Sequence, residues 1–118
     1  MKKLTYTLLF ASGLAFGQFF EKDKTFTKQD TLKGSNTIFR NFWDVKKYDL
    51  SVEPDFMQKS IKGNNTISFE IIKDVTNPTF QIDLQQPMKT DKVTASFPIE
   101  YKQDGDFIWV KAKKTFKK

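Results

Sequence analysis

From Phe42 onward, apolar and polar residues alternate with a period of two, which is typical of β-strands that bury one face. In a first strand the apolar side carries Tyr48, Leu50 and Val52. In a second strand the apolar side carries Ile61, Gly63, Asn65, Ile67, Phe69 and Ile71. Pro54-Asp55 interrupts the alternation, and the connection over 53–58 is short enough for a hairpin. Gly63, in the middle of its strand, indicates a bulge or a close backbone approach.

The alternation returns in shorter segments after a polar break over 73–78. Phe80, Ile82 and Leu84 predict a third strand, and Lys92–Ser96, centred on Val93, predicts a weaker one. The runs 99–101 and 107–110 flank an Asp-Gly pair, which is a strong signal for a hairpin. The sequence therefore predicts an all-β fold of about six short antiparallel strands, arranged as a sheet or sandwich. The residues expected to be prominent in its core are Tyr48, Leu50, Val52, Ile67, Phe69, Ile71, Ile82, Leu84 and Trp109.

The N-terminus has the three-part pattern of a secretory signal peptide. Lys2 and Lys3 precede an uncharged, largely apolar run over 4–16, which is too short to span a membrane, and small residues follow at Ala15 and Gly17. We expect a signal peptide over 1–17, cleavage near Gly17/Gln18, and an exported protein that is periplasmic or extracellular. A buried N-terminal element is the alternative.

Residues 18–40 show no clean period and are predicted to be an extended leader. Phe19, Phe20 and Phe26 offer apolar contacts through which this leader would lie over a domain surface, and simple disorder is the alternative. The third segment, 41–118, is the predicted β-domain.

Composition narrows the classes of function. Removing 1–17 takes away two lysines and no acid, so the formal charge of +6 becomes +4, an excess that mostly serves solubility. The chain has no cysteine, so its stability must come from a hydrophobic core without disulfides. No apolar run after the N-terminus is long enough for a transmembrane segment.

The chain also has no histidine. It therefore lacks the usual nitrogen and sulfur ligands of zinc and cannot build a Ser-His-Asp or Cys-His catalytic arrangement. No phosphate-binding glycine loop or dinucleotide fingerprint occurs. We predict that this chain is not an enzyme and has no catalytic, cofactor-binding or metal-binding residues.

Two polar features have simpler explanations than a site. Asp104 and Asp106 flank Gly105 in a predicted turn, and turn chemistry accounts for both. Asn64-Asn65-Thr66 is a formal N-glycosylation sequon, and the simpler explanation is a short polar run on a strand face. Whether Asn64 is modified is left open because it depends on the host.

The basic C-terminal run over 111–118 has two interpretations, an arm for an acidic polymer or anionic lipid, or a solvated strand end. Its five lysines accompany one aromatic residue, which is too few for a single-strand nucleic-acid surface. We therefore predict no nucleic-acid partner.

Several ordered segments resemble the opening of the M1 peptidases, the aminopeptidase N-like gluzincins. "FWDVKKYDLSVEPD" over 42–55 and "KSIKGNNTISFEI" over 59–71 are similar to the first two strands of that family, in which a Tyr-Asp-Leu strand is followed by an I-x-G-x-x-x-I-x-F strand. "FQIDL" over 80–84 is similar to the family's next strand, and "FTKQDTLKGSNTIFRNFWDV" over 26–45 resembles the leader of exported bacterial members.

This resemblance implies part of the M1 N-terminal saddle domain, which is roughly twice as long as the length available here. In the family, a zinc-dependent aminopeptidase domain with Gly-x-Met-Glu-Asn and His-Glu-x-x-His motifs follows it, and neither motif occurs in this chain. No functional residue of the family can be carried over onto a position of this sequence.

The family continues past the lysine-rich run with further strands, so we expect a truncated or split gene product, with a natural short paralogue as the alternative. The first functional hypothesis is a non-catalytic N-terminal fragment of an M1-like zinc aminopeptidase, whose partner is the missing remainder. The second is a small exported β-domain that binds a protein partner at an exposed sheet edge.

Overall fold

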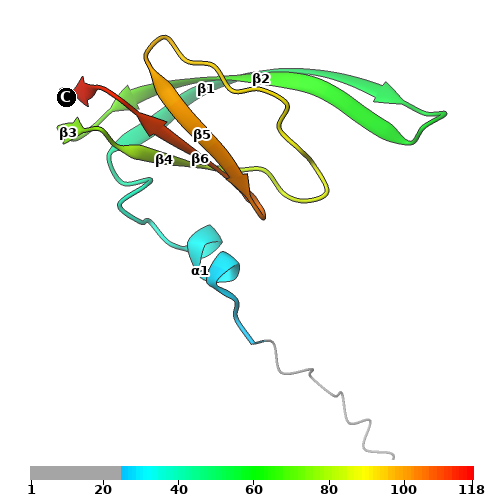
Figure 1. Ribbon diagram of the computed structural model, residues 1–118, viewed down its shortest axis with the longest axis horizontal. Helices are drawn as coiled ribbons and strands as arrows, with labels where there is room; N and C mark the ends of the chain where they lie inside the picture. Colours follow the sequence, from blue (N-terminus) through cyan, green and yellow to red (C-terminus); the bar gives the residue numbers. More distant parts are fainter. Residues whose placement is uncertain (1–24) are drawn as a thin grey trace, which may run out of the picture.

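The computed structural model describes residues 25–118, which form a mostly β structure with antiparallel sheets and one short helix (Figure 1). The predicted signal peptide over 1–17 and the first residues of the leader, with Phe19 and Phe20, lie outside the described residues. The elements in chain order are α1 (Lys28–Gly34), β1 (Trp43–Asp55), β2 (Ser60–Ile71), β3 (Val75–Thr76), β4 (Thr79–Asp83), β5 (Ile99–Asp104), β6 (Phe107–Ala112) and β7 (Thr115–Phe116).

The helix α1 begins at a capping box. The Thr27 hydroxyl accepts a hydrogen bond from the Asp30 backbone N–H at 3.2 Å, and the Asp30 carboxylate accepts one from the Thr27 backbone N–H at 2.8 Å. The expectation of an extended leader is therefore wrong over 28–34, because this local cap stabilises a helical turn without needing an apolar stripe. Phe26 is exposed and does not anchor the leader.

The predicted hairpin of the first two strands is confirmed. β1 and β2 pair antiparallel, with Tyr48 opposite Ile67 and Asp55 opposite Ser60. The Asp55 carboxylate accepts hydrogen bonds from the backbone N–H groups of Met57 and Gln58, at 3.0 and 2.9 Å. This side chain therefore fixes the conformation of the turn.

A β-bulge interrupts the hairpin at Lys46. Val45 lies opposite Phe69 and Lys47 lies opposite Ser68, so Lys46 is an extra residue in β1. Because the bulge absorbs this residue, the face that carries Val45 continues through Tyr48 toward the turn. The Lys46 ammonium donates to Asp44 and lies 2.9 Å from Glu70, and these two carboxylates raise its pKa.

The second predicted hairpin is also confirmed. β6 pairs antiparallel with β4 on one side and with β5 on the other, giving a three-stranded sheet in the order β4-β6-β5. Gly105 in the β5–β6 turn has φ of 58°, a left-handed conformation that favours glycine.

The predicted weak strand Lys92–Ser96 is wrong, since this segment is loop. The loop is held by the Gln103 side chain, which donates to the Met88 carbonyl at 2.9 Å and accepts from the Thr90 N–H at 2.8 Å. Val93 still packs against the hydrophobic core. Its apolar character therefore reflects burial in a loop.

The core lies between the base of the hairpin and the three-stranded sheet. Its buried residues are Phe42, Phe80, Ile108, Val110 and Ala112. Phe80 is central, since its ring lies 4.9 Å from that of Phe42, 5.2 Å from Trp43 and 5.2 Å from Phe69 between centroids. Aromatic pairs in edge-to-face geometry are stabilising beyond the area they bury.

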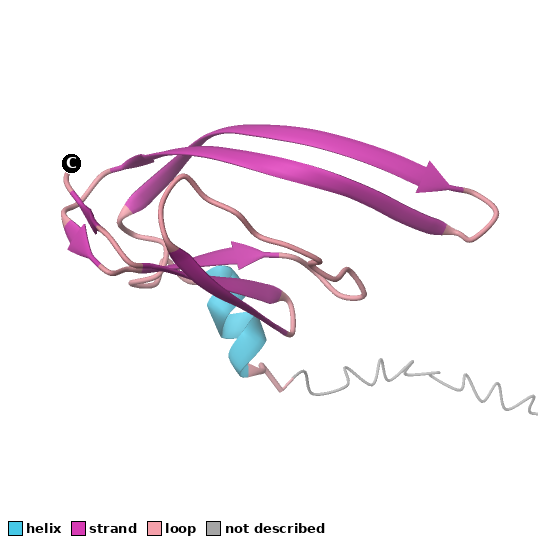
Figure 2. Ribbon diagram, turned by 45° about the horizontal axis from the view of Figure 1, so that its top comes forward, coloured by secondary structure: helices cyan, strands magenta, loops and turns pink. Residues whose placement is uncertain are grey.

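The segment that contains α1 covers the other face of the three-stranded sheet (Figures 1 and 2). Gln81 is buried on this face, and its side-chain amide donates to the Leu32 carbonyl at 3.3 Å. The rings of Phe39 and Trp109 meet edge to face at 5.1 Å. The described chain therefore has the hairpin base on one side of this sheet and the α1 segment on the other.

The predicted core is partly wrong. Phe69, Ile71, Ile82 and Leu84 pack against the core, partly buried, as expected. Tyr48, Leu50 and Val52 are instead exposed, because nothing in the described chain covers their part of the hairpin face. Ile67 is half-buried and stands outside the core cluster. Trp109 is half-buried on the opposite face of β6, against Phe39.

Candidate interaction surfaces

The hairpin is much longer than the sheet that covers its base. β1 has 13 residues, whereas β5 and β6 have six each. At about 3.3 Å per residue, these strands span roughly 43 Å and roughly 20 Å. The outer half of the hairpin therefore extends past the three-stranded sheet, as both ribbon views show (Figures 1 and 2).

The uncovered half keeps an apolar face. Tyr48, Leu50, Val52 and Ile61, which we call the bare face, are 60, 68, 52 and 63 % exposed. They lie on the same side of the ribbon as Val45 and Phe69 at its base. The bulge accommodates the extra residue Lys46, so the side chains on either side of it keep the same alternation between the two faces. The bare face is therefore a direct continuation of the face that forms the core.

Two further large apolar side chains stand at the turn of the hairpin. Phe56 is 86 % exposed and Met57 is 94 % exposed. The alternation of apolar and polar residues does not reveal this pair, although an aromatic residue beside a methionine in a polar turn is a visible signal in the sequence. The length of the alternation over 43–71, compared with the short runs after residue 79, is the signal that predicts an uncovered half.

Gly63 lies in the middle of this half, opposite Val52. A Cβ atom at this position would lie 2.2 Å from the backbone oxygen of Ser51. The predicted close backbone approach at Gly63 is therefore confirmed, and the ladder has no bulge there.

The outer edge of β5 is open in the described chain. Within residues 25–118, no backbone hydrogen bond joins 99–104 to a strand other than β6. The other outer strand, β4, is partly covered, since the Gln81 backbone N–H donates to the Phe39 carbonyl at 3.3 Å. An open edge presents backbone donors and acceptors to a further strand. Glu100 and Lys102 put charges of both signs on this edge.

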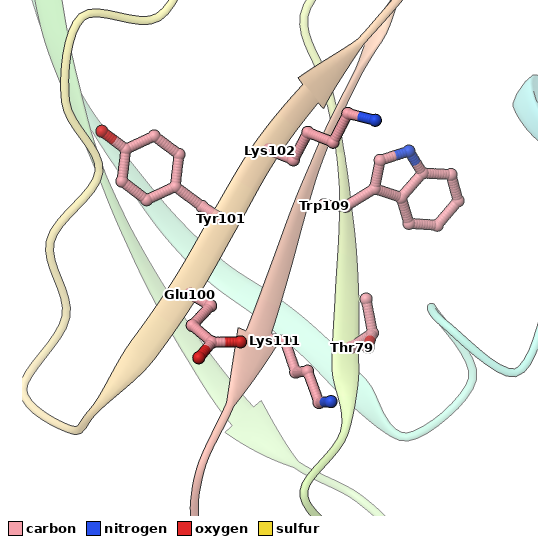
Figure 3. Close-up of a pocket in the computed structure, with 6 residues that line it drawn as sticks. All are labelled: Thr79, Glu100, Tyr101, Lys102, Trp109 and Lys111. Carbon is pink, nitrogen blue, oxygen red and sulfur yellow. The ribbon is translucent and has the colours of Figure 1, made fainter.

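A shallow, open depression lies beside the β5–β6 pair (Figure 3). Trp109 and Lys102 project from one side of the sheet, while Tyr101 points to the other. Thr79, Glu100 and Lys111 complete its lining. The depression is widely open to solvent.

Asp106 has a structural role in the predicted turn around Gly105. Its carboxylate accepts a hydrogen bond from the Gln86 backbone N–H at 3.0 Å and pairs with the Lys33 ammonium from α1. These contacts, the Gln86 hydrogen bond first, hold the pKa of Asp106 below its ordinary value. The hydrogen bond to Asp106 raises the pKa of Lys33. Asp104 is exposed at the end of β5.

The lysine-rich run over 111–118 pairs with and packs against other parts of the described chain. β7 pairs with β3, and Phe116 packs against the core. The Asp74 carboxylate accepts hydrogen bonds from the Lys117 ammonium and the Lys118 backbone N–H, each at 2.9 Å. Asn64, the sequon residue, is exposed on the polar face of the hairpin, opposite Ser51.

Within residues 25–118, no three acidic, histidine or cysteine side chains gather closely enough to hold a metal ion. In the same part of the chain, no helix is long and apolar enough to cross a membrane.

Comparison with known proteins finds no matching family model, no matching curated protein and no matching solved structure.

Proposed function

We propose that this chain is a non-catalytic β-domain of an exported M1-like zinc aminopeptidase, and that it binds a further protein segment at the open edge of β5. The observation that carries the binding part is this edge, which has no second backbone partner within the described residues. Strand addition at an open edge supplies main-chain hydrogen bonds, and alternate side chains supply specificity.

The charged residues of β5 favour a specific partner. Charged side chains on an edge strand discourage indiscriminate pairing with other chains. Lys102 would accept an added strand that places an acidic residue across from it, while the Glu100 carboxylate is paired with the Lys113 ammonium. The natural partner in this proposal is the remainder of the peptidase, in a layered β-arrangement that belongs to a larger saddle-shaped domain.

The M1 assignment is supported by the order of the similar segments along the fold. The Tyr-Asp-Leu segment at 48–50 lies in β1, and Ile61, Gly63, Ile67 and Phe69 lie on the paired strand β2. Most of the third similar segment, 80–84, forms β4. Zinc and the peptidase chemistry would belong to the rest of such a protein, which removes amino acids from the N-terminus of peptides.

The second candidate is a complete exported binding module with no enzyme attached. The closed core around Phe80 favours it, since this part of the chain buries its own apolar residues.

One experiment separates the two candidates. The DNA after the codon for Lys118 is sequenced, and the chain is expressed alone and with any continuation in frame. We expect a continuation that encodes His-Glu-x-x-His, and slowed amide hydrogen exchange at 100–103 in the longer protein because a strand then pairs with β5. A cooperative, monomeric unfolding transition of the short chain, with no peptidase sequence downstream, would instead support the binding module.

A further inference from the structure

The outer half of the hairpin exposes large apolar side chains on its bare face and at its turn, away from the β5 edge. Six large side chains are involved, namely Tyr48, Leu50, Val52, Ile61, Phe56 and Met57. At on the order of 100 Å² of exposed area each, they present about 600 Å², which is the upper end of what soluble monomers expose as one patch. Apolar patches of this size are often functional, which favours an interaction surface.

We propose that this surface pairs with the same surface of a second copy of the chain, so that the bare faces of two hairpins pack against each other. This proposal concerns a different surface from the β5 edge and does not rest on the proposed function.

The area supports a second copy as the occupant. Two surfaces of about 600 Å² bury about 1,200 Å² together, which is the lower end of the range for specific protein interfaces. A two-fold arrangement would place the same residues on both sides, as in most homodimers. We therefore expect a reversible dimer.

The charge distribution also supports it. The bare face carries no charged residue, so two copies can meet without opposing like charges. Over 48–67, three acids stand against two lysines, namely Asp49, Glu53 and Asp55 against Lys59 and Lys62. A surface that inserts into anionic lipid normally carries an excess of lysine or arginine, which this hairpin lacks.

The shape of the face permits close approach. Gly63 has no side chain and is exposed between Ile61 and Asn65, so backbone is accessible at the middle of the face. A large side chain of the other copy, such as Leu50, can pack on this position. Interdigitation of large and small side chains is what gives two packed sheets their density.

The test measures the mass of the purified full chain by sedimentation equilibrium over a range of concentrations. The variant Leu50→Lys places a charge in the bare face, and Ser51→Lys places the same charge on the exposed polar face one residue away. We expect a dimer for the unmodified chain and for Ser51→Lys, and a dissociation constant at least tenfold higher for Leu50→Lys. Far-UV circular dichroism checks that each variant is folded, and Ile61→Lys replaces Leu50→Lys if that variant does not fold.

Three outcomes would overturn the proposal. These are a monomer at every concentration for the unmodified chain, an equal loss of dimer in Leu50→Lys and Ser51→Lys, or a monomer that floats with phosphatidylglycerol vesicles through Leu50. The β5 edge is monitored separately by amide exchange at 100–103, so a failure of this proposal leaves the proposed function to its own test.

Discussion

The two halves of the β1–β2 hairpin share one apolar pattern and differ in what covers it. At the base, Phe69 and Ile71 pack against the three-stranded sheet, and Phe42 beside them is 2 % exposed. In the outer half, Leu50 has the same chemistry and orientation but is 68 % exposed. Alternation therefore specifies which face of a strand is apolar, whereas burial depends on whether another layer reaches it.

The comparison implies that the two halves contribute unequally to stability. Phe80→Ala should lower the free energy of unfolding by about 3–5 kcal/mol, because it removes a buried ring from the centre of the core. Leu50→Ala should change it by only about 0.5 kcal/mol or less in the monomer, as expected for an exposed position. Urea denaturation of both variants at low protein concentration measures this difference. Similar losses for the two variants would show that the outer half is buried within the monomer.

The variant Gly63→Ala tests how tightly the backbones of β1 and β2 pack in the outer half of the hairpin. The new Cβ would lie 2.2 Å from the Ser51 oxygen, so the two strands must move apart locally. We expect a cost of about 1–3 kcal/mol, the usual range for forcing extra atoms into a tight contact. Amide exchange should become faster over 51–65 and remain unchanged at 108–112, since the base does not depend on this contact. Uniform acceleration across both segments would mean that the halves open together.

The smallest effect concerns pH and the α1 segment. Because the folded pKa of Asp106 lies below its ordinary value of 3.8, its carboxylate stabilises the fold above that pH. This contribution is lost as the pH falls through the lowered pKa, when Lys33 and the Gln86 N–H lose their charged partner. Tryptophan fluorescence, to which Trp109 beside Phe39 contributes together with Trp43, should change below about pH 4 in the parent chain.

The control for this titration is Asp106→Asn. That variant should show a smaller change over the same pH range, because it has no carboxylate to protonate. An identical titration in the variant would assign the change to other acidic groups and would leave the hairpin comparison unaffected.

Local patterns predicted the elements of the fold better than their packing. The β1–β2 hairpin and the Asp-Gly turn at 104–105 follow from alternation and turn chemistry, which act over neighbouring residues. The exposure of Leu50 could not be predicted, because it depends on how far β5 and β6 reach, which is a property of the assembled sheets. The cap at Thr27 and Asp30 was a readable local signal for α1 that the apolar periodicity did not contain.

The sequence indicated that the chain would have an exposed sheet edge, but it did not show which strand would form that edge. An exposed sheet edge follows from a small number of strands, but only the pairing order identifies β5 as the outer strand of the three-stranded sheet that has no second backbone partner within residues 25–118. The exposure of Phe56 and Met57 follows from the turn, since Asp55 binds the backbone there and leaves both side chains in solvent.

The bulge at Lys46 has a consequence for changes in chain length. Side chains of a regular strand alternate between its two faces, so Trp43 and Val45, at odd positions, would face away from Tyr48 and Leu50, at even ones. All four lie on one face because Lys46 has no partner residue in β2. Deleting Lys46 would give an uninterrupted ladder with the same two faces, at the cost of its ion pairs with Asp44 and Glu70. Deleting any one residue over 48–54 would instead turn every side chain between that point and the turn to the opposite face. The bulge at Lys46 is therefore a place where β1 can lose one residue while the apolar face of the hairpin keeps its orientation.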